Sequence, residues 1–341
     1  MKKTHLGIAV LFLMGAAGAG SLSAPPGGQA DGGKPAAPAP FRWPLEVVRP
    51  WDEAAVRPSA WSDALNAACD LRLRGRAGQE HLYRIWRQNV AYDQYGRPFS
   101  ATVSSAECRH TLLRETGPGR WVQKIAWESF AYGESSSPGG EPKARAFEKA
   151  RGIAYEYDPA TFDPLNPPGD FGRLGEPLAA YALKVLGMDT AMFDSLPLAF
   201  VRPSGDGVGI GVSAGSAGPA STAAIGKGGT GEVSGSYGLA GSTVSVAGLT
   251  RCLGQPCALI LYSSEGNSIK QDMGSGPGAM RMEGTEYFRG SMAVSLLDGH
   301  VVAGELSGFI PMVMAVPGQA PTASPVLGVL QQVSLREVPR L

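Results

Sequence analysis

Charged residues are scarce in this sequence, and neither sign is in excess. Asp, Glu, Lys and Arg make up 18% of the 341 residues, with 30 basic against 30 acidic side chains and a formal net charge of zero. A chain without a strong field of one sign has little to attract it to nucleic acid or to an anionic membrane surface. We therefore expect no nucleic-acid partner.

The chain also lacks long stretches that are free of glycine and proline. There are 47 Gly and 27 Pro residues, and both residue types interrupt helices. Long uninterrupted helices are therefore not expected. Hydrophobic residues still account for 43% of the chain, which is enough for one sizeable core or two smaller ones.

No apolar run in the chain is long enough to cross a bilayer, which takes about 20 residues. A short apolar stretch, Leu6–Met14, follows two lysines near the N-terminus, and small residues continue from it to Ala24. These three parts are typical of a secretory signal peptide. We predict a signal peptide over residues 1–24, with cleavage after either Ala19 or Ala24. The protein is then exported, to the periplasm or the medium, with no transmembrane segment in the mature chain.

Two segments have so little apolar side-chain surface that no fold is predicted for them. Residues 25–40 contain 13 Pro, Gly or Ala residues in 16, and residues 204–235 contain 21 Gly, Ser or Ala residues in 32. Such compositions do not bury enough surface to offset the entropy of ordering. We predict a disordered tether at 25–40 and a single domain over 41–341 that carries a flexible insertion at 204–235. Two domains, 41–203 and 236–341, are the alternative.

Alternating apolar and polar residues predict strands through much of the remaining chain. In Trp121–Phe130 one face carries large apolar side chains and the other carries Lys124 and Glu128, which is typical of a strand with one buried face. A second such run, Phe288–Leu297, is followed by Asp298-Gly299 and then by more strand-like residues. Asp-Gly favours a type I′ hairpin turn, and this pattern indicates an antiparallel sheet.

One segment, Pro177–Leu186, has its apolar residues at helical spacing instead. Proline is accepted in a first helical turn and Gly187 favours a C-terminal stop, so we predict a helix over 176–186, with a second short helix after Asp189. The predicted fold class is α+β, a mainly antiparallel β-sheet packed on a short central helix, with an all-β fold as the alternative.

Four cysteines are few for this length, but in an exported chain an even number first suggests disulfides. Cys252 and Cys257 bracket a predicted tight turn, which leaves Cys69 to pair with Cys108. Other connectivities stay open. A metal site that joins Cys108 and His110 is the alternative, but the paired short cysteine spacings of structural zinc sites are missing, so no metal is predicted.

All six tryptophans lie within the first 127 residues. A cluster of tryptophans on one sheet face can line a groove for a sugar or an apolar ligand, because each ring offers a large apolar face and one polar N–H. Trp86, Trp121 and Trp127 are the candidate groove residues. The alternative is that they form the core beneath the helix.

Motifs with catalytic meaning occur, but their context does not support them. Ser213 sits in a G-x-S-x-G string without the strand and helix that expose such a nucleophile, and 226–231 matches a dinucleotide-binding string in an equally unsuitable context. No catalytic residue and no cofactor is therefore predicted. An exported hydrolase would instead need two converging carboxylates. The candidates on or near predicted strands are Glu128, Glu156, Glu283, Glu286 and Glu305.

Together these observations predict an exported, non-catalytic binding or envelope-associated protein. Its ligand would be a small apolar molecule or a sugar, held in an apolar groove between sheet and helix. An exported hydrolase and a purely structural surface protein are the alternative functions.

Overall fold

The computed structural model describes residues 71–92, 95–135, 141–158, 171–197, 222–225, 233–238, 242–273, 280–315 and 326–338. The predicted signal peptide, the predicted tether, Cys69 and Ser213 lie outside these residues.

Strands dominate the described part of the chain, which also contains one α-helix, α2 (Pro177–Ser195), and two short 3-10 helices, η3 (Glu148–Ala150) and η4 (Phe171–Leu174). The strands are β1 (Glu80–Tyr92), β2 (Pro98–Gly117), β3 (Arg120–Ser135), β4 (Arg145–Ala146), β5 (Ala154–Tyr157), β6 (Thr222–Ile225), β7 (Val233–Gly238), β8 (Ser242–Cys252), β9 (Gln255–Met273), β10 (Met280–Ser295), β11 (Val301–Ala315) and β12 (Val326–Glu337).

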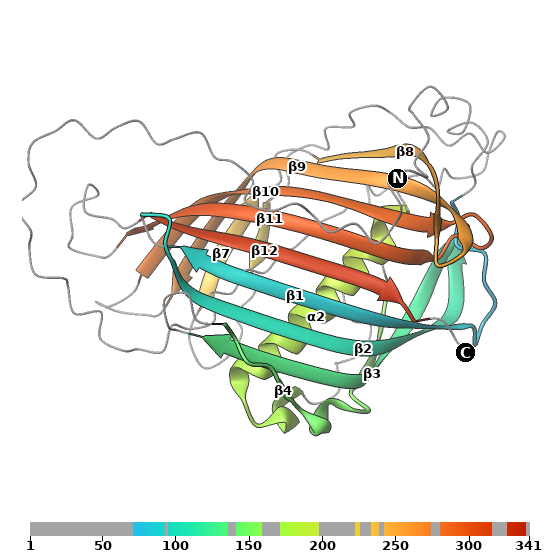
Figure 1. Cartoon of the computed structure of the whole chain (residues 1–341), viewed down its shortest axis with the longest axis horizontal. Coiled ribbons are helices and arrows are strands. Elements are labelled where there is room, and N and C mark those ends of the chain that lie inside the picture. The colour runs from blue at the N-terminus through green and yellow to red at the C-terminus, as the bar shows by residue number, and fades with distance from the viewer. Residues whose placement is uncertain are drawn as a thin grey trace, which may run out of the picture.

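These twelve strands of the described residues form one antiparallel sheet that curves around α2 (Figure 1). The order along the sheet is β4-β3-β2-β1-β12-β11-β10-β9-β7-β6, while β5 pairs with β3 and β8 pairs with β9. The mainly antiparallel sheet with one helix that the sequence predicts is thus confirmed. Among the described residues, no helix has both the length and the apolar character needed to cross a membrane.

The pairing of β1 with β12 joins strands from the two ends of the described chain. It places Tyr83 opposite Glu337, Ile85 opposite Leu335 and Arg87 opposite Val333. Directly paired residues have their side chains on the same face of the sheet. Tyr83 and Glu337 therefore both point to the face that α2 covers. Residues more than 240 positions apart in sequence therefore become direct neighbours.

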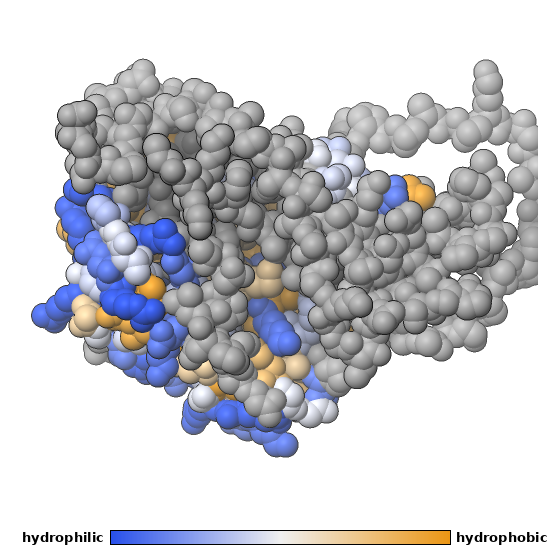
Figure 2. Space-filling view, turned by 180° about the vertical axis from the view of Figure 1, so that it is seen from behind, coloured by the Kyte–Doolittle hydropathy of each residue, from blue (hydrophilic) through white to orange (hydrophobic). Residues whose placement is uncertain are grey.

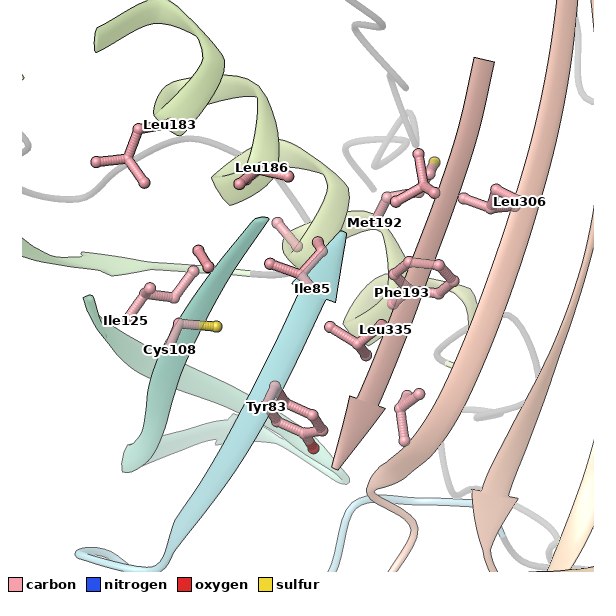
Figure 3. Close-up of a cluster of buried hydrophobic side chains, with 14 of the residues drawn as sticks. Tyr83, Ile85, Cys108, Ile125, Leu183, Leu186, Met192, Phe193, Leu306 and Leu335 are labelled. Atoms are coloured by element: carbon pink, nitrogen blue, oxygen red, sulfur yellow. The ribbon is translucent and has the colours of Figure 1, made fainter. Parts of the chain in front are cut away.

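The hydrophobic core lies between α2 and the concave face of the sheet (Figure 3). Leu183, Leu186 and Phe193 of the helix are fully buried, as are Ile85 and Ile125 on the strands facing it. Apolar surface removed from water contributes about 25 cal/mol per Å², so this interface is a main source of stability. The side chains labelled in Figure 3 are Tyr83, Ile85, Cys108, Ile125, Leu183, Leu186, Met192, Phe193, Leu306 and Leu335.

The predicted end of the helix at residue 186 is wrong, because α2 continues through Gly187 to Ser195. A Cβ atom at position 187 would lie 2.0 Å from the Tyr155 hydroxyl oxygen and 3.5 Å from Cζ2 of Trp127. Glycine is therefore needed here for the close approach of β5 and β3 to the helix, and it does not act as a stop. Helical stability in proteins comes mostly from tertiary packing, which overrides the unfavourable propensity of one glycine.

A buried ion pair also fixes α2 to the sheet. The Arg87 guanidinium on β1 donates to both carboxylate oxygens of Asp189 at 2.8 and 2.9 Å, and to the Gln331 side-chain oxygen on β12 at 2.8 Å. Burial raises the pKa of Asp189, while Arg87 opposes that rise. The pair ties the middle of the helix to the β1–β12 junction.

The β10–β11 connection differs from the predicted two-residue hairpin turn. Ser295 N–H donates to the His300 carbonyl at 2.9 Å, so four residues lie in the loop between them. Gly299 has a φ of +80°, whereas Asp298 is not in the left-handed region that a type I′ turn requires at both positions. The short strand β6 lies within residues 204–235, and β7 overlaps their end.

Candidate functional site

Three side chains from distant parts of the sequence meet at the end of the sheet where β1 begins and β12 ends. His81 lies on β1 two residues before Tyr83, which pairs with Glu337 of β12. His300 ends the loop before β11, and β11 pairs with β12 through Ala303 and Arg336. The two strand pairings therefore bring both imidazoles to one carboxylate.

The Glu337 carboxylate contacts both histidines. Its Oε1 lies 3.1 Å from Nδ1 of His81, and its Oε2 lies 2.9 Å from Nε2 of His300. The two imidazole rings stack with centroids 4.2 Å apart. We call His81, His300 and Glu337 the sheet-end cluster.

Two further side chains hold the imidazoles of the sheet-end cluster in place. Asp298 Oδ1 lies 2.5 Å from Nδ1 of His300, and the Gln79 amide nitrogen lies 3.1 Å from Nε2 of His81 and 3.3 Å from Asp298 Oδ2. A carboxylate on the second nitrogen of a histidine fixes its tautomer and is typical of metal-ligating histidines.

The electrostatics of the sheet-end cluster strongly favour bound positive charge. Burial alone would lower the pKa of His300, but hydrogen bonds to Asp298 and Glu337 outweigh it and raise the pKa to about 9. Burial alone would raise the pKa of both carboxyl groups, yet the hydrogen bonds to the histidines lower them to about 2 for Asp298 and about 2 for Glu337. Two half-buried carboxylates therefore lie against the two buried imidazoles.

The ligand atoms of the sheet-end cluster are close enough to share one cation. One nitrogen from each histidine and one oxygen of Glu337 lie within 4.8 Å of one another. Zinc–ligand bonds of about 2.0–2.2 Å in a tetrahedral site put neighbouring ligand atoms about 3.3–3.6 Å apart, so the three side chains must move only slightly toward a common centre to hold one ion.

A small cavity of about 20 Å³ lies beside the sheet-end cluster. Its walls include His81, His300, Tyr83, Trp121 and Asp194. A cavity of about 10–15 Å³ on this scale holds one water molecule, so the space suits a water molecule or an ion and is too small for a sugar ring. The visible described surface in Figure 2 is mostly hydrophilic, with hydrophobic residues in separate spots.

A second buried histidine lies across Tyr83 from the first. Nδ1 of His110, on β2, lies 3.1 Å from a carboxylate oxygen of Asp194 on α2. The Tyr157 hydroxyl donates to the same carboxylate. Burial alone would lower the pKa of His110, but Asp194 outweighs it and raises the pKa to about 10. The Tyr83 ring meets His110 edge-on with centroids 4.8 Å apart. We call His110, Asp194 and Tyr157 the helix-side cluster; it offers one carboxylate and one imidazole.

The structure does not bring the three candidate groove tryptophans together. Trp121 and Trp127 lie on the concave face, where Trp121 borders the cavity and Trp127 is buried next to α2. Trp86 stands between the buried Ile85 and Arg87 in β1, so its side chain points to the opposite, convex face. The Trp121 indole nitrogen donates to the Leu73 carbonyl at 3.1 Å.

The predicted disulfides are not supported, because Cys108, Cys252 and Cys257 are all free. Cys108 lies on the concave face in the core, whereas Cys252 and Cys257 belong to a separate small cluster with Leu259 and Ala293. The β8–β9 register pairs Cys252 with Gln255 and Cys257 with Thr250, so these two thiols are diagonal neighbours and not direct partners. Burial raises the pKa of Cys257 to about 12.

The predicted carboxylate candidates lie elsewhere on the sheet. Glu128 is ion-paired with Arg109, and Glu156 with Arg114. Glu286 and Glu305 are buried on β10 and β11.

The sheet-end cluster has no sequence signature, because its members His81, His300 and Glu337 are separated by 219 and 37 residues. Short ligand spacings such as H-x-x-x-H are the usual sequence signal of a metal site, and none exists here. The only local hint is Asp298-Gly299-His300, which places a carboxylate two residues before a histidine.

Comparison with known proteins gives no family, since no family model and no curated protein matches the chain. Solved structures with some likeness include OmpTdeltaL8, a loop L8 deletion mutant of the Vibrio cholerae outer membrane protein OmpT, at 8% identity and a TM-score of 0.20, covering 76% of this chain and 100% of that one. Another is Pseudomonas aeruginosa OccK7 (OpdD), at 7% identity and a TM-score of 0.17, covering 78% and 99%. TM-scores this low do not indicate a shared fold.

Proposed function

We propose that this is an exported, non-catalytic binding protein whose ligand is a divalent transition-metal ion, held by His81, His300 and Glu337. The observation that carries the proposal is the convergence of two buried imidazoles on one carboxylate, with a second carboxylate behind one of them. Two histidines and one carboxylate suit zinc and also iron(II), and zinc is the probe of choice because it has no redox chemistry.

The size of the cavity supports an ion in preference to a sugar or an apolar ligand. About 20 Å³ of space lies beside the imidazoles, while the volume between sheet and helix is filled by core side chains. Export is proposed from the N-terminal signal pattern alone. Mass spectrometry of the native protein from the exported fraction tests export: a mature N-terminus after Ala19 or Ala24 supports it, and an intact Met1 contradicts it.

Zinc binding is tested by equilibrium dialysis of the chelator-treated protein. We expect one zinc ion per chain in the wild type and its loss in His300→Gln and Glu337→Gln. His110→Gln is the matched control, because it replaces another buried histidine that has a carboxylate partner but lies outside the sheet-end cluster. Equal loss of zinc in the control, or no stoichiometric binding in the wild type, would contradict the proposal.

A further inference from the structure

The segment Leu71–Gln79, which precedes β1, lies across the end of the sheet next to the sheet-end cluster; we call it the strap. Leu71 is buried in the core, and both Leu71 and Leu73 line the cavity together with His81 and His300. The strap therefore forms one wall of the space beside the two imidazoles.

Specific hydrogen bonds attach the strap to two turns of the sheet. The Arg74 backbone N–H donates to the Asp298 carbonyl at 2.6 Å, and its guanidinium donates to the Leu296 carbonyl at 3.0 Å. On the other side, Trp121 donates to the Leu73 carbonyl at 3.1 Å. The β10–β11 loop and the start of β3 are thereby joined through the strap.

Two glycines in these turns allow the strap to pack directly on the backbone. Gly299 and Gly119 have φ values of +80° and +71°. A Cβ atom on Gly299 would lie 2.2 Å from the Arg72 carbonyl oxygen, and one on Gly119 would lie 2.8 Å from the Arg72 Cβ. A side chain at either position would push the strap away from the sheet.

The strap also contacts the groups that orient the imidazoles. Gln79, its last residue, bonds to His81 and to the Asp298 side chain. His81 and His300 are only 8% and 7% exposed. A hydrated ion must lose water and reach these nitrogens, so some part of the surrounding chain has to open first.

We propose that the strap is the gate of the metal site and that its opening sets the rates at which the ion enters and leaves. This inference rests on the proposed function, since it concerns the regulation of the same site. The strap is the natural gate because Leu73 and Arg74 bond to the start of β3 and to the β10–β11 loop. Only its last two residues, Gly78 and Gln79, bond to a strand ladder, at Leu112 of β2.

The test is stopped-flow measurement of zinc uptake and of zinc release to a chromophoric chelator, with Arg74→Ala as the main variant. Loss of a charge-assisted hydrogen bond to the Leu296 carbonyl should raise both rates about five- to tenfold, while Kd changes less than about threefold. Gly299→Ala should raise the rates further. The matched control is Arg84→Ala, which removes another exposed arginine, one that pairs with Glu107 away from the strap.

The outcomes separate the gate from the proposed function. Equal acceleration of uptake and release in Arg74→Ala, absent in Arg84→Ala, supports the gate. Unchanged rates in a variant that still binds zinc at equilibrium overturn the gate and leave the proposed function standing. Faster release with a matching loss of affinity also overturns it, because Arg74 would then stabilise the bound state. No zinc binding in the wild type overturns both.

Discussion

The two buried histidine clusters on either side of Tyr83 use similar residues in different arrangements. In the helix-side cluster, one imidazole and one tyrosine share the Asp194 carboxylate, which also borders the small cavity. In the sheet-end cluster, two imidazoles converge on Glu337 beside a cavity, with Asp298 and Gln79 behind them. Both raise the pKa of a histidine, to about 10 for His110 and about 9 for His300.

A shifted pKa therefore does not by itself mark a binding site. His110 has the larger upward shift, yet only one carboxylate faces it, and that carboxylate is already bonded to Tyr157. What distinguishes the sheet-end cluster is the number of ligand atoms that converge. We therefore expect the helix-side cluster to act in stability and the sheet-end cluster to act in binding.

The largest expected effect is on stability, from Asp194→Asn. This variant leaves a buried imidazole without its charge partner, and breaking a buried pair costs about 3–5 kcal/mol of unfolding free energy. Urea denaturation measures that loss, while the zinc Kd should stay within about threefold of wild type because Asp194 contacts no member of the sheet-end cluster. If Asp194→Asn kept wild-type stability but lost most of its zinc affinity, the helix-side cluster would act in binding and the comparison would be contradicted.

Gly187→Ala should perturb the helix side of the molecule without changing the sheet-end cluster. The new Cβ would lie 2.0 Å from the Tyr155 hydroxyl oxygen, and overpacking of a well-packed core costs about 1–3 kcal/mol. Thermal denaturation should show the loss in the metal-free protein. A neutral or stabilising result would mean that β5 moves away from α2 at little cost.

Asp298→Asn should mainly lower zinc affinity, whereas Asp194→Asn should mainly lower stability. Loss of a carboxylate behind a metal-ligating histidine lowers metal affinity about 10- to 100-fold. Competition with a zinc chelator measures this change, and urea denaturation of the metal-free variant should show a smaller loss of stability than Asp194→Asn. Wild-type zinc affinity in this variant would contradict a positioning role for Asp298.

The stability of the metal-free protein should also depend on pH. A histidine whose folded pKa is raised stabilises fully below its unfolded pKa, near 6.5, and this contribution is lost as the pH rises through the folded value of about 10 for His110 and about 9 for His300. His110→Gln and His300→Gln should each flatten part of the decline between these limits. Wild-type pH profiles in both variants would show that neither imidazole is charged in the folded state.

Local patterns were enough to predict much of the sheet. Alternation around Trp121–Phe130 and Phe288–Leu297 depends on neighbouring residues only, and these segments lie within or overlap β3 and β10. The helix end could not be predicted, because the need for glycine at 187 arises from Tyr155, which is distant in sequence. The local rule that glycine ends a helix therefore predicted the wrong boundary.

The candidate site could not be predicted from sequence patterns for the same reason. Glu337 meets His81 only because β1 pairs with β12, and no local signal specifies that pairing. The cysteines show the converse: Cys252 and Cys257 are close in sequence, but the β8–β9 register makes them diagonal neighbours. Spacing along the chain therefore predicted a disulfide and missed the sheet-end cluster.

The most direct test of the metal site is a crystal structure of the zinc-loaded protein with anomalous data at the zinc edge. We expect one anomalous peak, about 2.0–2.2 Å from Nδ1 of His81, Nε2 of His300 and an oxygen of Glu337. A zinc-loaded crystal with the peak elsewhere, or with the histidines still bonded to Glu337 and no peak between them, would contradict the proposal.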